Sequence, residues 1–175
     1  MAPSLHGGLV ASIGGETILC SRAAFPESWT VVAATPEFEL ETKRARAALP
    51  REIAHADAVF NVQRAAFLMA QIVQGRGEGL REAMRDRLHQ PYRSALLPGL
   101  AEILELEDCE GLLGVALSGA GSTVIAFTDS HAEEAGEKMR AIFARHGLKS
   151  MVRLLRADNV GMARETGEAN CRLGM

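Results

Sequence analysis

Short apolar runs separated by turn residues open the chain and predict β-structure there. Two such runs, LVASI and ETILC, flank the pair Gly14–Gly15, which is typical of a β-hairpin. Residues 30–34, TVVAA, are β-branched and apolar, so we expect a buried strand that ends at Pro36. Three later apolar runs predict further strands: residues 112–117, 123–127 and 150–155.

The strongest helical pattern covers residues 52–74. Apolar residues recur there at spacings of three and four and extend round much of the circumference, so we expect a mostly buried helix. Gly75 and Gly77 mark its end, because glycine readily takes the left-handed conformation that closes a helix. One polar residue, Asn61, interrupts the apolar stretch VFNV and needs hydrogen-bond partners if it is buried.

Four shorter helices are predicted around the long one. The first covers residues 42–49, with Thr42 as its N-cap. A charged helix covers residues 78–89 until Pro91 stops it, because proline lacks the N–H that would continue the ladder. The remaining two helical patterns cover residues 98–106 and 131–146.

The order of these elements predicts the fold class. The last third reads strand, strand, helix, strand, and together with the earlier elements this indicates an α+β fold. We expect helices packed on one face of a mostly antiparallel sheet, in one domain over residues 1–155. Residues 156–175 hold few large apolar side chains, so we expect a poorly ordered tail there.

Composition narrows the classes of function. The chain has 175 residues, 47% hydrophobic and 23% charged, with a net charge of −3, so neither a nucleic-acid nor a membrane partner is expected. Cys20, Cys109 and Cys171 are odd in number and far apart, which favours reduced thiols in a cytoplasmic protein. The five histidines show no metal-ligand spacing, and we predict neither a metal site nor a catalytic residue.

Two segments carry the candidate chemistry. DRLHQPYR, residues 86–93, is expected to end a helix, turn on Pro91 and leave Arg93 just past the turn. LSGAGSTV, residues 117–124, is a glycine-rich loop between two strands. It lacks the lysine and the following helix of a nucleotide phosphate loop, so its glycines favour a tight turn or a close backbone approach. Together the two segments predict a site for a small anionic metabolite.

Arginines are the candidates for binding such an anion. Arg46 and Arg93 would clamp a carboxylate if they converge, since a guanidinium can form two parallel hydrogen bonds with it. The alternative is that each lies at a solvated helix end. Asp57, Asn61 and Arg64 share one stripe of the long helix. For them we favour a structural network that ties the helix to a loop over direct contact with a ligand.

Several segments occur in the order found in one family. MAPSLHGGL, TKRARAALP, DAVFNVQRAAFL, DRLHQPYR and LSGAGSTVIAF resemble the C-terminal part of homoserine kinases, which are GHMP small-molecule kinases. The resemblance extends from Ala2 to about Leu155 and implies a ferredoxin-like GHMP kinase C-terminal domain. It further implies phosphorylation of the L-homoserine hydroxyl with ATP and Mg, a step in threonine biosynthesis.

The resemblance also implies roles for single residues. Arg46 matches the arginine of the family's TKxAR segment and Arg93 that of DRxHxPxR, which implies that both bind the substrate carboxylate. Thr42 opens the first segment and is a further substrate-binding candidate. Asn61 is counted with the supporting residues, as is the match to the family's third motif: Ser118, Gly119, Ala120 and Gly121. Ser122 stands where the family usually has proline.

The family's N-terminal motifs are missing from this sequence. Met1 stands in place of a valine that follows a His-Pro-Asp-Asn stretch in the family, and the phosphate loop and the Mg-supporting acidic residue are not found. We therefore expect the isolated chain to be inactive and to bind ATP and Mg only weakly. A start assigned at a GTG valine codon would explain the pattern, and the upstream DNA would test it.

Two other interpretations stay open. The chain can be a non-catalytic binding or interaction module, which forms a homo-oligomer or pairs with a chain supplying the nucleotide-binding half. An apolar surface left bare by a missing half would favour such association. The chain can also be the inactive product of a decayed gene.

Overall fold

The computed structural model describes residues 2–162, and the chain divides into two compact units. The smaller unit combines the residues up to Ala24 with those from Asp158 on, while the larger unit runs from Phe25 to Ala157. The sequence did not predict this division. Most of the predicted tail, residues 163–175, lies outside the described part of the chain.

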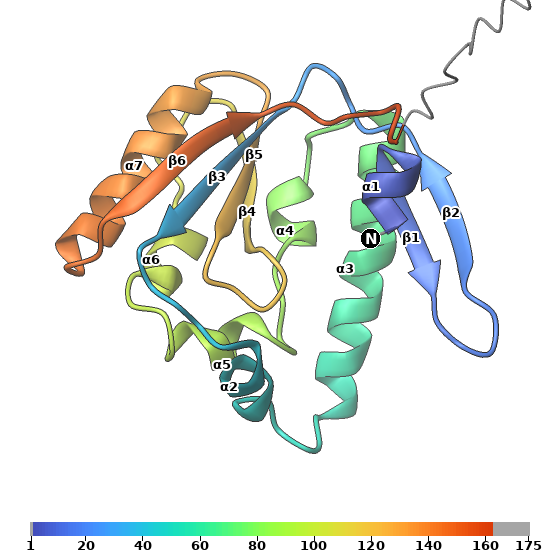
Figure 1. Ribbon diagram of the computed structural model, residues 1–175, viewed down its shortest axis with the longest axis horizontal. Helices are drawn as coiled ribbons and strands as arrows, with labels where there is room; N and C mark the ends of the chain where they lie inside the picture. The colour runs from blue at the N-terminus through green and yellow to red at the C-terminus, as the bar shows by residue number, and fades with distance from the viewer. Residues whose placement is uncertain (1, 163–175) are drawn as a thin grey trace, which may run out of the picture. The chain divides into compact units, whose positions relative to one another are not determined.

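The smaller unit contains a short helix and a hairpin: α1 (Ala2–His6), β1 (Leu9–Ile13) and β2 (Leu19–Ala23) (Figure 1). The two strands pair antiparallel, and Gly14 and Gly15 lie in the loop between them, which confirms the predicted hairpin. The N–H of Gly8 donates to the carbonyl of Asp158 at 2.7 Å. This bond joins the two sequence segments that make up the unit.

The larger unit is built on a four-stranded sheet: β3 (Thr30–Pro36), β4 (Leu112–Leu117), β5 (Val124–Thr128) and β6 (Ser150–Leu155). Their order across the sheet is β4-β5-β3-β6, and every neighbouring pair is antiparallel. Helices intervene between β3 and β4 and between β5 and β6. This is the β-α-β-β-α-β order of a ferredoxin-like fold, so the predicted α+β class is confirmed.

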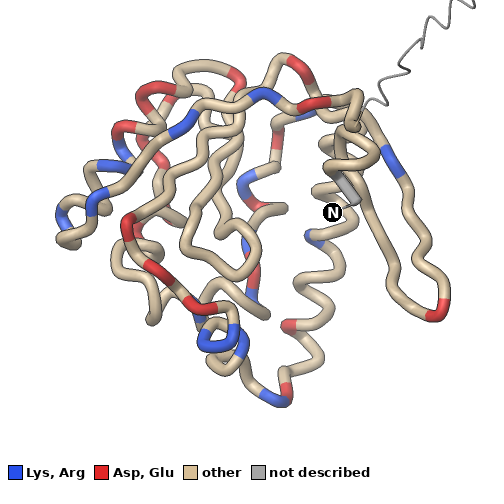
Figure 2. The backbone as a smooth tube through the Cα atoms, in the orientation of Figure 1, with Lys and Arg blue, Asp and Glu red and all other residues tan. Residues whose placement is uncertain are grey.

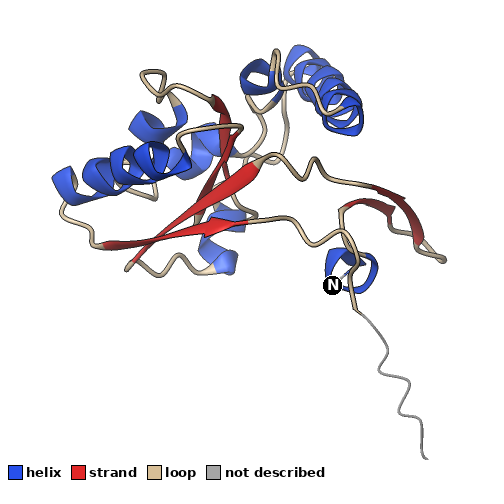
Figure 3. Cartoon of the chain, turned by 90° about the horizontal axis from the view of Figure 1, so that it is seen from above, coloured by secondary structure: helices blue, strands red, loops and turns tan. Residues whose placement is uncertain are grey.

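Helices cover one face of this sheet, as predicted. α7 (Ala132–Arg145) lies along β3 and β6, and α6 (Leu100–Leu104) contacts β4 (Figures 1 and 3). Aliphatic and aromatic side chains from both layers form the buried core: Val32, Ala34, Leu97, Leu100, Ile103, Val115, Val124, Ala126, Ala135, Met139, Ile142 and Phe143. Removing this apolar surface from water is the main stabilising contribution to the unit.

The long helix α3 (His55–Gln74) forms where predicted and ends at Gly75, which has a φ of 65°. The prediction that it is mostly buried is wrong, because Ile72 is its only buried residue. Val62 is 70% exposed and Val73 58% exposed. Apolar spacing shows that a helix has a face to bury, but it does not show whether the described chain covers that face. No helix among residues 2–162 is long and apolar enough to cross a membrane.

The helix predicted over residues 78–89 is wrong. Only α4 (Leu80–Ala83) is helical there, and turns follow it. A new helix, α5 (Gln90–Ser94), begins before Pro91, so the proline starts a helix instead of stopping one. Proline is well tolerated in the first helical turn, where its missing N–H would have no partner in any case. As a consequence Arg93 lies on a helix and not in a loop after the turn.

Candidate functional site

α5 carries Arg93 into the interior of the larger unit. The residue is 8% exposed, and its Nη1 donates to the carbonyl of Gly119 at 2.7 Å. Its Nε is buried without a hydrogen-bond partner, and Arg93 forms no ion pair with any residue of the described chain. Burying a guanidinium without a counterion is costly, so this arrangement suits a ligand with an anionic group.

The carboxylate of Asp86 organises the turn before α5, and its side chain is 13% exposed. It accepts the backbone N–H groups of Leu88 at 2.9 Å, His89 at 2.7 Å and Gln90 at 2.5 Å. Nδ2 of Asn61 donates a fourth bond at 2.5 Å. Burial by itself raises the pKa of this carboxyl group, but the four donors, led by the N–H of Gln90, outweigh that effect and hold the pKa below its ordinary value.

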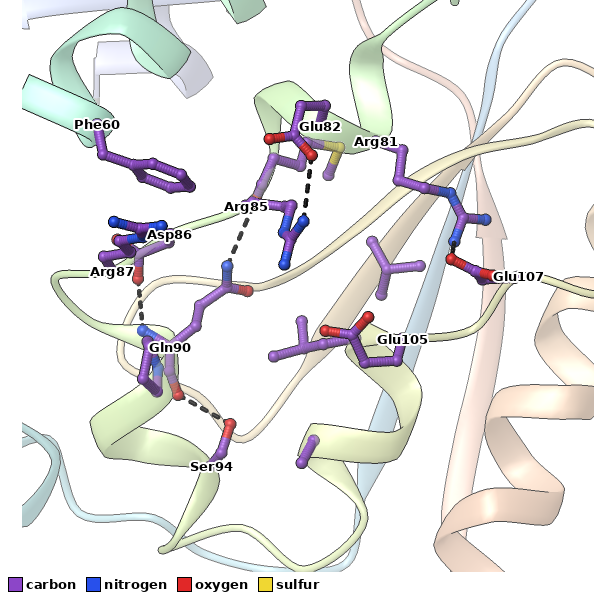
Figure 4. Close-up of a pocket in the computed structure, with 15 residues that line it drawn as sticks. Phe60, Arg81, Glu82, Arg85, Asp86, Arg87, Gln90, Ser94, Glu105 and Glu107 are labelled. Carbon is purple, nitrogen blue, oxygen red and sulfur yellow. Dashed lines mark hydrogen bonds and ion pairs between the residues drawn. The ribbon is translucent and has the colours of Figure 1, made fainter. Parts of the chain in front are cut away.

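Gln90 joins α5 to the end of β4. Its side chain is buried, with Nε2 donating to the carbonyl of Met84 at 3.1 Å and Oε1 accepting the N–H of Leu117 at 2.8 Å. Figure 4 shows this side chain extending from α5 towards the segment that carries Glu82 and Arg85. Leu117 is the last residue of β4, so Gln90 holds the point at which the glycine loop begins.

The glycine loop itself is a tight turn between β4 and β5. The N–H of Ser118 donates to the carbonyl of Thr123 at 2.9 Å, and that of Gly121 donates to Ser118 at 3.0 Å. Gly121 has a φ of 96°, and a Cβ atom there would lie 3.2 Å from Cδ2 of Leu40. The expected tight turn and close approach are therefore both present. The structure thus brings together two predicted segments, because Arg93 of the first binds the carbonyl of Gly119 in the second.

Arg46 lies on α2 (Thr42–Ala47) and is exposed. Its side chain forms no hydrogen bond or ion pair with any described residue, and it shares no partner with the side chain of Arg93. Figure 2 shows that α2 is basic and that an acidic segment precedes it. The predicted N-cap is wrong, since Glu41 occupies that position and Thr42 is the first helical residue. Buried Ala45 and Leu40 hold this short helix in place, so it needs no side-chain cap.

The polar stripe on α3 forms the network that we favoured. Asp57 pairs with Arg87, Arg64 pairs with Glu82, and Asn61 binds both Asp86 and the N–H of Arg87. All of these bonds tie α3 to the segment from α4 to α5. Sequence reasoning missed the partners on that segment, Glu82, Asp86 and Arg87. Charged residues at this spacing are also typical of the exposed face of a helix, which is how they were interpreted.

A cavity of about 560 Å³ lies beside this network (Figure 4). The arginines that line it are already paired, Arg81 with Glu107 at 3.6 Å, Arg85 with Glu82 at 3.3 Å and Arg87 with Asp57 at 3.1 Å. Arg93 does not line the cavity. The described chain also holds no group of three or more His, Cys, Asp or Glu residues that could bind a metal ion. The unpaired cation therefore marks the better candidate site.

Known proteins are similar to this chain in sequence and in fold. The family "GHMP kinases C terminal" matches residues 68–145. A homoserine kinase of Moorella thermoacetica is 43% identical over 162 residues, which cover 92% of this chain and 55% of that protein. One of Solibacter usitatus is 44% identical over 149 residues, which cover 84% of this chain and 49% of that protein.

Solved structures agree with the sequence matches. The crystal structure of homoserine kinase from Cytophaga hutchinsonii superposes with a TM-score of 0.85 at 27% identity, covering 91% of this chain and 51% of that chain. The chain thus spans about half the length of the relatives it matches. These matches confirm the resemblance stated from the sequence: residues 68–145 match the C-terminal domain of GHMP kinases, and most of the chain is similar to about half of each of these homoserine kinases.

Proposed function

We propose that this chain is the substrate-side portion of a homoserine kinase, the part that binds L-homoserine through its carboxylate. The observation that carries the proposal is the state of Arg93. It is buried, its Nε has no partner, and it forms no ion pair within the described chain. A substrate carboxylate would supply the missing counterion through charge-assisted hydrogen bonds. The relatives named homoserine kinase support this choice of substrate.

The other predicted residues take secondary roles in this proposal. Arg46 and Thr42 contact the substrate from α2, and the guanidinium of Arg46 is available because no described residue binds it. The loop from Ser118 to Gly121 supports Arg93 through the carbonyl of Gly119.

We assign the binding of MgATP to the part of these relatives that this chain does not span. No group of three or more potential metal ligands lies among residues 2–162, and the glycine loop leads into β5 instead of a helix N-terminus. Phosphoryl transfer depends on positioning and neutralising the phosphates. The chain alone should therefore phosphorylate homoserine no faster than a buffer control.

Calorimetric titration tests the binding site. L-homoserine should bind more tightly than its alcohol analogue, 2-amino-1,4-butanediol, which lacks the carboxylate. Arg93→Lys should weaken homoserine binding at least roughly tenfold, because an ammonium group cannot replace the planar two-pronged contact. Arg46→Ala should weaken it as well. Arg140→Lys, on the exposed side of α7, is the matched control and should change nothing. Equal affinity for the two ligands would contradict the proposal.

Reconstitution tests the proposed activity. The chain would be co-expressed with the remaining part of the Moorella thermoacetica relative and assayed for ATP-dependent phosphorylation of homoserine. Activity should appear only when both polypeptides are present and should fall with Arg93→Lys. Activity of the chain alone would contradict the proposed division of roles.

A non-catalytic interaction module remains the second candidate, and α3 is the observation that favours it. Five large apolar residues along this helix and just before it are exposed: Ile53, Val59, Val62, Phe67 and Val73. Exposed apolar patches commonly mark contact surfaces. Light scattering during size-exclusion chromatography separates the candidates. A homo-oligomer that Val62→Gln dissociates, without homoserine binding, would favour the module.

A further inference from the structure

α5 is too short to hold its own orientation. It has five residues, and a single helical turn is unstable in isolation because nucleation is costly. The direction of Arg93 must therefore depend on contacts at the two ends of this helix. At the end near the glycine loop, the contact is the bond from Arg93 to Gly119.

At the other end, three consecutive backbone N–H groups, those of residues 88–90, donate to Asp86. Asp86 is itself held by Asn61, whose amide also accepts the N–H of Arg87. Because Asn61 belongs to α3, the start of α5 is anchored to the longest helix of the larger unit. Asp86 also lies 3.5 Å from Nδ1 of His89, and the other carboxylate at this turn, Asp57, binds the side chain of Arg87 and none of the N–H groups of residues 88–90.

We propose that Asp86 is a positioning residue for Arg93: its carboxylate fixes the start of α5, so that the guanidinium is pre-oriented for an anionic ligand. This inference rests on the proposed function, because it assumes that Arg93 binds the substrate carboxylate. Asp86 does not need to touch the ligand. Pre-orienting a binding group removes the cost of ordering it when the ligand arrives.

Nuclear magnetic resonance of the ¹⁵N-labelled chain tests this inference directly. The buried Nε–H of Arg93 should give a resonance that exchanges slowly with solvent, assigned by its loss in Arg93→Lys. Asp86→Ala should accelerate its exchange about tenfold, since it removes the acceptor of the N–H groups of residues 88–90. Asp86→Asn keeps one acceptor oxygen and should give an intermediate value. Asp57→Asn is the control, because it breaks another tie between α3 and the turn but leaves residues 88–90 bonded.

Two results would overturn the inference. One is unchanged exchange of the Arg93 Nε–H in a folded Asp86→Ala, or in Asp86→Asn if the alanine variant does not fold. The other is an equal acceleration in Asp57→Asn, which would show a general loosening of the unit.

Homoserine affinity, measured on the same samples, separates this inference from the proposed function. Across the Asp86 variants, the affinity for homoserine should fall in the same order as the protection of the Arg93 Nε–H from exchange with solvent. An altered Arg93 resonance without any homoserine binding by the unsubstituted chain would count against the proposed substrate and leave the positioning role standing.

Discussion

Asp86 keeps its charge because four hydrogen-bond donors surround it, and this preference links stability to pH. Its pKa is lower in the folded chain than the value of about 3.9 expected for an unfolded one. The ionised form therefore stabilises the fold above that unfolded value, and the contribution is lost as the pH falls through the folded pKa.

This linkage gives a prediction for Asp86→Asn. At pH 7 the substitution should lower the free energy of unfolding by about 1 to 2 kcal/mol, since an uncharged amide is a poorer acceptor for several N–H groups. The difference between the two proteins should shrink as the pH falls below 4. Urea unfolding at a series of pH values measures it. A difference that stays constant down to pH 3 would contradict the assigned role of the charge.

At the residue scale, sequence reasoning succeeded where a side chain had to have a partner. Asn61 was expected to need hydrogen bonds because it interrupts an apolar stretch, and it has them. The identity of the partner, Asp86, was not predictable because it depends on how a turn folds. Whether Arg46 and Arg93 serve one ligand stays a prediction, since no contact links them.

At the element scale, α7 packs closely on the sheet at one glycine. A Cβ atom on Gly136 would lie 2.7 Å from Cγ1 of Val152 on β6. Alanine normally stabilises a helix interior relative to glycine by about 1 kcal/mol. In this position the collision with the half-buried side chain of Val152 should outweigh that gain.

We therefore expect Gly136→Ala to lower the free energy of unfolding by about 1 to 2 kcal/mol. The double substitution Gly136→Ala with Val152→Ala should recover part of the loss, because the smaller side chain vacates the space. Glu137→Ala, next to it on the exposed side, serves as the control. Increased stability of the single variant in thermal unfolding would show that α7 can move away from the sheet.

The elements that the sequence predicted well are those whose pattern is decided locally. The hairpin and the strands follow from short apolar runs between turn residues, and α7 follows from its amphipathic spacing. The helix expected over residues 78–89 was wrong because the carboxylate of Asp86 accepts the backbone N–H groups of residues 88–90, which a continuous helix would use itself. The burial of α3 was wrong because burial depends on what lies opposite a helix.

At the scale of the whole molecule, the two units should lose structure independently. Gly7 tests this, because it has a φ of 68° and a Cβ atom there would lie 2.5 Å from the backbone N of Gly161. Gly7→Ala should therefore speed amide hydrogen exchange in β1 and β2 at least about tenfold, while β3 and β5 keep their protection. Gly14→Ala, which meets no atom within 4 Å, is the control. Loss of protection in both units together would show that they unfold as one.

The division into units also sets an order of synthesis. The chain leaves the smaller unit at Ala24 and returns to it at Asp158, so the larger unit is an insertion in the sequence of the smaller one. A ribosome making this chain releases the complete larger unit before residues 158–161 emerge. β1 and β2 are translated before the larger unit but wait for contacts with almost the last residues described, so the smaller unit should be the second of the two to fold.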